Sequence, residues 1–317
     1  MGKKSLAITI LLMFVLIVTA CSDTKNETRR SIGTGGSGGV FYIMGAGIGN
    51  LVTTKSDVLD LTAQSTAATT ENLNLVNDGD LDFAFSVYDA AVDAINGEGG
   101  YDKLDNLRIV MAGHGGYKHL IVREDSKINS IADLKGKKVG ISPGDIGKKL
   151  FSATIEPYGL TLDDLETVPL SYTEMSNGLK DKTLDAISVL AGLPASSVIE
   201  LGSSIDIRFL SQTEEGIKKL TADYPYWFDA TIPAESYKQE ADIKTFVAPY
   251  VIIANKDVPD EVVYDFIKIM FENESDIEAI HPEGKNYSAN NEFYTQEPLV
   301  PYHEGAEKYL KEQGVIE

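Results

Sequence analysis

The chain has 317 residues, of which 43% are hydrophobic, and it carries a formal net charge of −20 at pH 7. That length exceeds what a single hydrophobic core usually serves, so we expect two lobes. Such an acidic chain argues against nucleic acid as a partner, yet it leaves open a small anion held by amide dipoles in a buried site.

The N-terminus has the pattern of a secretory signal. Lys3 and Lys4 precede an apolar run over residues 6–20, and Cys21, the only cysteine, follows at once. The run is shorter than the roughly 20 residues of a membrane-spanning helix. Because residues 18–21 (VTAC) look like a bacterial lipobox, we interpret 1–20 as a lipoprotein signal peptide, Cys21 as the lipidated residue and 21–30 as a polar tether. A plain signal peptide or an N-terminal anchor helix are the alternatives.

From about residue 31, short apolar strands alternate with helical stretches, which predicts an α/β fold with largely parallel sheets. In the first part we expect helices over 40–54, 69–78 and 88–95, and a strand over 80–86. After residue 125 we expect a short helix over 131–136, strands over 138–142, 184–190 and 205–210, and a helix over 146–158. Amphipathic helices are expected over 261–271 and 305–312.

Two long extended segments, 119–123 and 246–255, flank the second unit. We interpret them as crossovers between lobes, so that the second lobe is an insertion in the first. This assigns residues 31–123 and 246–317 to lobe 1, and residues 124–245 to lobe 2.

The strongest local feature is a glycine-rich run, GTGGSGG over residues 33–39, followed by a predicted helix. Such a turn exposes unpaired N–H groups at the positive end of the helix dipole and so forms a cradle for an anion. The run also contains G-x-G-x-x-G, with Asp57 and Asp60 roughly 20 residues further on, as in dinucleotide-binding folds. That alternative is weak because residues 27–32 make a poor buried strand. A glycine loop that only turns the chain is the other alternative.

A comparable turn occurs in the second lobe at residues 142–147 (SPGDIG). It is not a P-loop, because Ser142 stands at the first glycine position and Lys149 replaces the Ser or Thr that would hold magnesium. Two interpretations of this turn stay open: it faces an anion, or it only connects the strand to the helix. Asp145 could itself occupy the N–H groups of the following helix.

Ligands of open α/β sheets lie beyond the carboxyl ends of the strands, where several further residues are expected. The predicted ligand-binding residues are Gly35, Gly36, Ser37, Gly38, Gly39, Phe41, Tyr42, Ser65, Thr66, Ser86, Tyr88, Gly144, Asp145, Ile146, Ala191 and Gly192. For the hydroxyl and aromatic side chains among them, a role as helix cap or core residue is the alternative.

Motifs for catalysis are nearly absent. His114 and His119 lie five residues apart, which is not the i, i+4 pair of a helical zinc site, and there is no G-x-S-x-G elbow. We therefore expect no catalytic residues, no metal and no cofactor.

The sequence resembles the receptors of the TAXI family of TRAP transporters over residues 31–317. The resemblance is carried, in chain order, by SIGTGGSGGVFY (31–42), ENL (71–73), VREDS (122–126), DLKGKKVG (133–140), VPDEVVY (258–264), HP (281–282) and PYHEGAEKY (301–309). It implies a two-lobed periplasmic-binding-protein type II fold and delivery of the ligand to a TRAP membrane subunit driven by an ion gradient. It also implies an acidic ligand, such as a glutamate-like amino acid or a dicarboxylate. Asp145 and Ile146 depart from the family pattern of small residues.

These observations predict an exported, lipid-anchored solute receptor that acts as a monomer. Amides of residues 35–39, with hydroxyls of Ser65, Thr66 and Ser86, would hold one carboxylate, and the turn 144–146 would close over the other end. The alternatives are a binding protein of an ABC importer or a sensor and, more distantly, an exported enzyme.

Overall fold

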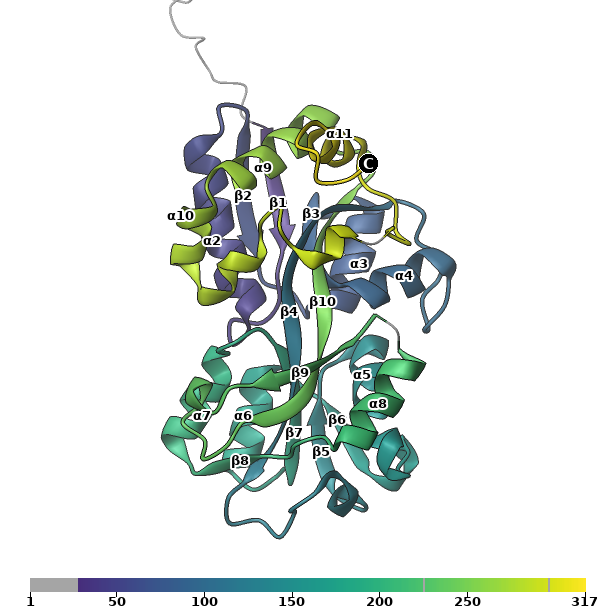
Figure 1. The fold of residues 1–317 in the computed structure, drawn as a ribbon, viewed down its shortest axis with the longest axis vertical. Helices are drawn as coiled ribbons and strands as arrows, with labels where there is room; N and C mark the ends of the chain where they lie inside the picture. The colour runs from purple at the N-terminus through teal and green to yellow at the C-terminus, as the bar shows by residue number, and fades with distance from the viewer. Residues whose placement is uncertain (1–27, 225, 296) are drawn as a thin grey trace, which may run out of the picture.

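The computed structural model describes residues 28–224, 226–295 and 297–317. The predicted signal peptide and Cys21 lie outside them. The elements form an upper group, here called lobe 1, and a lower group, lobe 2 (Figure 1). None of the described helices is long and apolar enough to cross a membrane.

Lobe 1 is built from both ends of the described chain. It contains β1 (Thr28–Gly33), α2 (Val40–Lys55), β2 (Leu59–Gln64), α3 (Thr69–Asp78), β3 (Phe83–Val87), α4 (Tyr88–Asn96), α9 (Asp260–Glu272), α10 (Glu274–Ile280), η5 (Pro282–Asn286), η6 (Glu292–Thr295) and α11 (Glu304–Glu312). The predicted helices over 40–54, 69–78, 88–95, 261–271 and 305–312 are confirmed to within a residue or two at each end.

Lobe 2 is the continuous middle of the chain. It contains η1 (Ile131–Leu134), β5 (Lys138–Ile141), α5 (Gly144–Ile155), η2 (Glu156–Tyr158), η3 (Leu162–Asp164), β6 (Glu166–Pro169), α6 (Tyr172–Lys180), β7 (Ala186–Ala191), α7 (Ser196–Ser204), β8 (Ile207–Phe209), α8 (Glu214–Asp223), β9 (Phe228–Ile232) and η4 (Ala234–Ser236). Two long strands, β4 (Leu107–Arg123) and β10 (Ile243–Asn255), run through both lobes (Figure 1).

The strands form one continuous sheet in the order β2-β1-β3-β10-β4-β7-β5-β6. The strands β2, β1 and β3 are parallel in lobe 1, and β7, β5 and β6 are parallel in lobe 2. The crossing strands are antiparallel to their neighbours, β10 to β3 and β4 to β7. Each lobe is therefore a mostly parallel sheet flanked by helices, as predicted.

The first crossover was placed wrongly by the sequence pattern. Residues 119–123 pair with β7 and β8 and so lie inside lobe 2. The strand β4 pairs with β10 up to Tyr117 and with β7 from Tyr117 onward, so it passes between the lobes before His119. The predicted crossover 246–255 does contain the passage of β10, which pairs with β9 up to Val247 and with β3 from Tyr250. The apolar stretch at 119–123 is a buried part of β4 within lobe 2. The part that crosses contains Gly113, Gly115 and Gly116 and so has no apolar pattern that would indicate a strand.

The strand β1 also corrects the sequence-based prediction. It begins at Thr28, so the last residues of the predicted tether belong to the sheet, where β1 lies between β2 and β3. Arg30 forms an ion pair with Asp82 at 2.8 Å, and Ile32 is fully buried. Because Asp82 pairs with the Arg30 guanidinium, a segment that is poor in apolar residues still forms an internal strand of the sheet.

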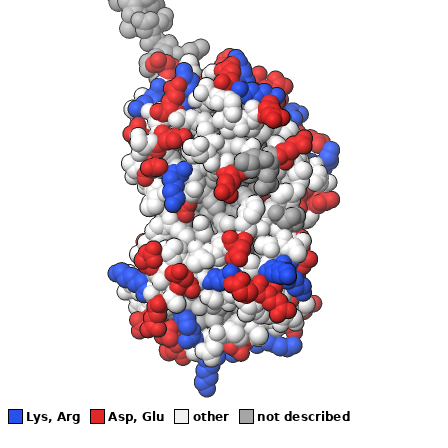
Figure 2. Space-filling view, viewed as in Figure 1, with Lys and Arg blue, Asp and Glu red and all other residues white. Residues whose placement is uncertain are grey.

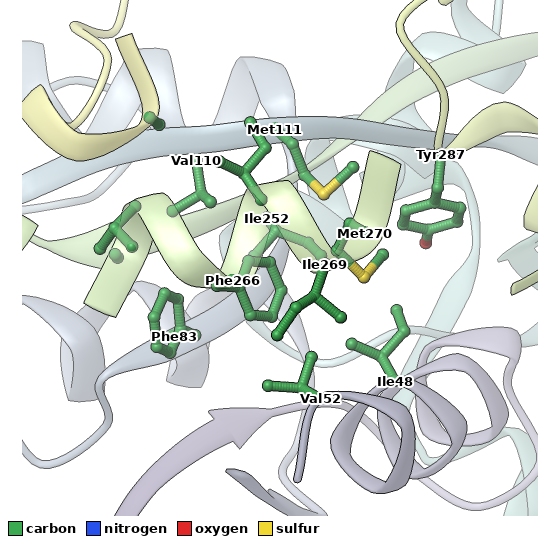
Figure 3. Packing of buried hydrophobic residues seen from close by; sticks show 14 of the residues in the cluster. Ile48, Val52, Phe83, Val110, Met111, Ile252, Phe266, Ile269, Met270 and Tyr287 are labelled. Carbon is green, nitrogen blue, oxygen red and sulfur yellow. The ribbon is translucent and has the colours of Figure 1, made fainter. Parts of the chain in front are cut away.

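The largest core of lobe 1 lies where α2 and α9 pack on the sheet. Phe266 of α9 stacks on Phe83 of β3 with ring centroids 4.9 Å apart, and both side chains are fully buried. Ile48 and Val52 of α2 belong to the same cluster of buried side chains (Figure 3). Burial of each such side chain contributes about 1.5–3 kcal/mol relative to exposure. This packing holds the N-terminus of α2, and with it the glycine-rich turn, in a fixed place.

A second core joins the two lobes. It includes Leu73 and Val87 of lobe 1 together with Ile146, Leu150 and Trp227 of lobe 2. The lobes are therefore in contact, and the structure is a closed form. Figure 2 shows one face of it, on which acidic and basic side chains are interspersed over both lobes.

Candidate ligand-binding cleft

A cavity of 360 Å³ lies between the lobes. Its wall combines the glycine-rich turn and α3 of lobe 1 with the starts of α5 and α6 of lobe 2. The volume is at the lower end of the range of about 300–1,000 Å³ that is typical of small-molecule sites. Its position between two lobes that contact each other is suited to a ligand that is enclosed when the lobes close.

Five helices begin at this cavity. The residues that immediately precede them all line it, namely Gly39 (α2), Ala68 (α3), Val87 (α4), Pro143 (α5) and Ser171 (α6). Only in α6 does a side chain, that of Ser171, cap the first turn. The first N–H groups of a helix carry a partial positive charge, so this convergence creates a positive potential without a basic residue.

None of the described residues that line the cavity is Lys or Arg. The nearest candidate in sequence, Lys149, is directed to Asp89 at 3.1 Å and to Asp93 at 2.6 Å. The carboxylate that lines the cavity, Glu174, is an exposed residue that accepts hydrogen bonds from the N–H and hydroxyl groups of Ser171. The Ser171 hydroxyl and N–H lower the pKa of Glu174, so this group is charged but already occupied.

Aromatic side chains form the floor of the cleft. Phe41 of α2 stacks on Phe85 at 4.9 Å and meets Tyr250 of β10 edge-on at 4.5 Å. Tyr250 and Tyr172 both donate a hydrogen bond to the backbone oxygen of Leu190. The two phenols are thus held in place, and they offer ring surface to a ligand.

The glycine-rich turn is closed by a hydrogen bond of 3.0 Å from the N–H of Gly39 to the oxygen of Gly36. Gly36 lines the cavity, and a side chain added there would meet nothing within 4 Å. The oxygen of Gly38 instead accepts from Ser197 N–H and from the Ser196 hydroxyl, both at 3.3 Å, across the lobe boundary. Gly36 therefore lies at the exposed edge of the cavity, while Gly38 connects the turn to α7.

The structure brings half of the predicted ligand-binding residues to the cavity. These are Gly35, Gly36, Gly39, Phe41, Thr66, Ile146, Ala191 and Gly192. They come from four separate strand-to-helix turns, two in each lobe. The expectation that such turns would converge at the carboxyl ends of the strands is confirmed for this set.

The other predicted residues do not line it. These are Ser37, Gly38, Tyr42, Ser65, Ser86, Tyr88, Gly144 and Asp145. The hydroxyls of Ser65 and Ser86 donate to the oxygens of Gly35 and Val87, both at 3.0 Å, so they satisfy the local backbone. Tyr42 points to solvent, being 38% exposed.

The turn at the start of α5 also differs from the prediction. Gly144 has a φ of +81° and packs against Thr70 of lobe 1, so it serves the contact between lobes. Asp145 does not occupy the cavity, because its carboxylate pairs with Lys148 at 3.2 Å near the surface. The expected competition between Asp145 and a ligand is therefore absent in this arrangement.

Several lining residues were not predicted. The most informative are His114 of β4, Tyr250 of β10, Tyr172 of α6 and Ser142 after β5. His114 and Tyr250 lie on the crossing strands, where side chains alternate between the two faces of the sheet. That alternation was the available signal, and correct placement of the crossovers would have been needed to use it.

A second and larger cavity, of 790 Å³, lies on the other face of the crossing strands. Val247 and Pro249 line it, on the face of β10 opposite to Tyr250. Tyr88 also lines it, and its hydroxyl accepts a hydrogen bond from Leu299 N–H at 2.8 Å. His114 and Lys285 also line this cavity, but no residue that precedes a described α-helix does, since Asn291 precedes only the short 3-10 helix η6. The smaller cleft is therefore the better candidate for an anion.

The described residues contain no group of three His, Cys, Asp or Glu side chains placed to hold a metal ion. The buried histidines are neutral, because burial lowers the pKa of His114 to about 3 and that of His119 to about 4. What the cleft offers is backbone N–H groups and aromatic surface, since the hydroxyls of Thr66, Tyr172 and Tyr250 already donate within the protein. That set of groups is suited to binding.

Comparisons with solved structures support the two-lobed fold. The alkanesulfonate-binding protein of Xanthomonas axonopodis pv. citri, bound to MOPS, is 15% identical, with a TM-score of 0.53 over 90% of this chain and 84% of that one. A binding component of an ABC phosphonate transporter of Pseudomonas aeruginosa is 13% identical, with a TM-score of 0.54 over 81% of this chain and 79% of that one. At these identities the likeness shows the fold, which is that of the type II periplasmic binding proteins.

Comparison with sequences gives the family. A candidate binding protein of Brucella abortus is 24% identical over 127 residues, which are 40% of this chain and 35% of that protein. The match thus spans about a third of the length of the curated relatives. The model of the NMT1-like family matches residues 32–314. Because this match covers most of the sequence, the chain belongs to the NMT1-like family.

Proposed function

We propose that the protein is a solute-binding protein that acts outside the cytoplasm, encloses a small organic anion between its lobes and passes it to a membrane transporter. The observation that carries the proposal is the convergence of five helix N-termini on a cleft that no basic side chain lines among the described residues. Backbone N–H groups in a water-excluded site bind oxyanions strongly. The ligand is released unchanged, so no catalysis is involved.

The ligand class follows from the rest of the wall. Phe41, Tyr172, Tyr250, Ile146 and Leu150 offer a largely apolar surface beside the helix N-termini. We therefore propose an anion with one compact head, a carboxylate, sulfonate or phosphonate, and an apolar body. A glutamate-like amino acid is less well suited, because its ammonium group would face the occupied carboxylate of Glu174 alone.

An ABC importer is the favoured transporter partner. The named structural neighbours include an ABC phosphonate-transporter component and an alkanesulfonate-binding protein, which supports the ABC alternative over the TRAP interpretation. A TRAP membrane subunit stays the second candidate, favoured by the sequence resemblance of the glycine-rich turn and the later segments. Co-purification of the tagged protein with its membrane partner distinguishes the two, because only an ABC importer contributes an ATPase.

The N-terminal pattern supports export and attachment by a lipid at Cys21. Metabolic labelling with a radioactive fatty acid tests this proposal. A labelled wild-type protein and an unlabelled Cys21→Ala variant are expected. Equal labelling of both, or of neither, would count against the lipid anchor.

The ligand class is tested by thermal unfolding with a panel of pentanesulfonate, pentanoate, butylphosphonate, glutamate, succinate, arginine and glucose. A ligand at 100 times its dissociation constant adds about 2.7 kcal/mol to the stability, which is a readily measured shift. We expect shifts with the first three compounds and none with arginine or glucose. Stabilisation by glucose or arginine alone would overturn the anion site.

A further inference from the structure

His114 occupies a special position on β4. It lines the cleft, its side chain is 1% exposed, and it is surrounded by aromatic rings. Phe41 and Tyr250 meet the imidazole edge-on, with ring centroids at 5.7 and 5.0 Å. These contacts hold the ring in one orientation, so the fold fixes the direction in which each ring nitrogen points.

One ring nitrogen has a partner within the protein. Nδ1 lies 2.6 Å from the hydroxyl of Tyr287, which is fully buried. Among the described residues, Nδ1 of His114 is the only hydrogen-bond partner of this hydroxyl, so we assign the phenolic hydrogen to this bond. A neutral imidazole that accepts at Nδ1 carries its hydrogen at Nε2.

The other ring nitrogen has no partner among the described residues. Nε2 is buried and makes no hydrogen bond. It faces Gly192, on the turn after β7 in lobe 2, which lines the same cleft: a side-chain carbon at Gly192 would lie 3.1 Å from Nε2 and 2.7 Å from Cδ2. The imidazole edge is thus covered by the opposite lobe when the lobes are closed.

A buried donor without an acceptor destabilises the form in which it is buried. Closure of the empty protein imposes this cost, because it removes Nε2 from water without supplying an acceptor. A ligand oxygen that lies between Nε2 and the turn at Gly192 would accept this hydrogen and avoid the cost. The same N–H would repel an ammonium or guanidinium group, which has only donors to offer.

We propose that His114 is the ligand-sensing residue of the cleft: its Nε2–H donates to an acceptor oxygen of the bound anion that lies between the imidazole and the turn at Gly192, so closure around the anion is favoured over closure of the empty cleft. The inference rests on the proposed capture of an organic anion between the lobes. It assigns to one side chain both the discrimination against cationic ligands and the coupling of closure to binding.

The test compares three variants of the full chain, purified in nonionic detergent. His114→Phe keeps an aromatic ring without the donor, and His114→Gln keeps a donor amide. His119→Phe is the matched control, because His119 is a fully buried histidine of the same strand whose nitrogens both have partners, Tyr117 O and Tyr237 Oη, each at 2.8 Å. The affinity for pentanesulfonate is measured by calorimetry. Closure without ligand is measured by the radius of gyration and by the fluorescence of Trp227, the only tryptophan.

We expect His114→Phe to bind pentanesulfonate about tenfold more weakly, which corresponds to about 1.4 kcal/mol, and to be more closed than the wild type when empty. We expect His114→Gln to keep its affinity within about threefold, and His119→Phe to leave affinity and closure unchanged. Wild-type affinity in His114→Phe would overturn the inference, and so would unchanged closure. If the wild type binds no member of the anion panel, the proposed ligand class fails, and the closure of the empty His114→Phe variant alone decides the role of His114.

Discussion

The Nζ atom of Lys149 lies 2.6 Å from a carboxylate oxygen of Asp93, and this ion pair joins α5 of lobe 2 to α4 of lobe 1. The same Nζ atom is 3.1 Å from Asp89, which is 5% exposed. Burial raises the pKa of Asp89 even though Lys149 opposes that shift. A buried carboxylate that depends on a cation from the other lobe stabilises the closed form selectively.

Replacement of Lys149 by Met should therefore weaken ligand binding. The change removes the cation that Asp89 and Asp93 contact when the lobes are closed, so it destabilises the closed form. Because Lys149 itself is 26% exposed, we expect a loss of about 1–2 kcal/mol, which is below the roughly 3–5 kcal/mol lost when a fully buried pair is broken. Calorimetric titration with the anion that stabilises the wild type gives the affinity.

Lys148→Met is the control for this variant. Its partner Asp145 lies in the same helix at 3.2 Å, and both side chains are largely exposed. Exposed pairs of this kind contribute little, so its affinity should stay within about twofold of the wild type. An equal loss of affinity in both variants would point to net charge instead of the connection between lobes.

The local elements could be predicted from the sequence because their signals are local. The helix 69–78 was placed correctly, since Leu73 and Val76 give its buried face and Gly79, with a φ of +80°, ends it. The glycine-rich turn was placed at the cleft for a similar reason. Glycines next to an amphipathic stretch specify a helix start whatever the rest of the chain does.

The floor of the cleft could not be predicted in this way. Tyr250 and His114 meet because β10 and β4 pair with a register shift between Pro249 and Val251. A shift of one residue moves a side chain to the other face of a sheet, and no local pattern gives the register between strands that begin 136 residues apart, at Leu107 and Ile243. Tyr88 illustrates the same difficulty, since it begins α4 beside the cleft yet points into the cavity behind it.

Gly36→Leu tests the proposed anion cradle directly. A side chain at Gly36 meets nothing within 4 Å, and no positive φ is required there, so the fold should tolerate the change. A leucine at this edge of the cleft would narrow the approach to the amides of the turn and so weaken ligand binding. We expect the melting temperature of the empty protein to change by less than about 3 °C, which corresponds to under 1 kcal/mol, and the affinity to fall at least tenfold. Wild-type affinity in this variant would rule out the cradle.

Gly192→Ala should prevent closure without unfolding either lobe. Its methyl carbon would lie 2.7 Å from Cδ2 of His114 and 3.1 Å from Cγ of Glu283, both in lobe 1. Glu283 also accepts a hydrogen bond of 2.7 Å from Leu193 N–H, so this edge of the closed form would be forced apart. We expect a larger radius of gyration in the presence of ligand and weaker binding. A wild-type radius with bound ligand would show that the His114 ring can move aside.

The pH dependence of stability follows from the buried histidines. Burial lowers the pKa of His119 to about 4, while an unfolded histidine titrates near 6.5. Between these values the unfolded state binds a proton that the native state does not, so the stability contributed by neutral His119 is complete above about pH 6.5 and is lost as the pH falls towards 4. The slope is about 1.4 kcal/mol per pH unit. His119→Gln removes the titrating group, so the difference in unfolding free energy between wild type and variant should shrink by that slope between pH 6 and 4.5. Urea unfolding at several pH values measures both curves, in which the carboxylates titrate alike, and parallel curves would mean that native His119 takes up its proton near pH 6.5.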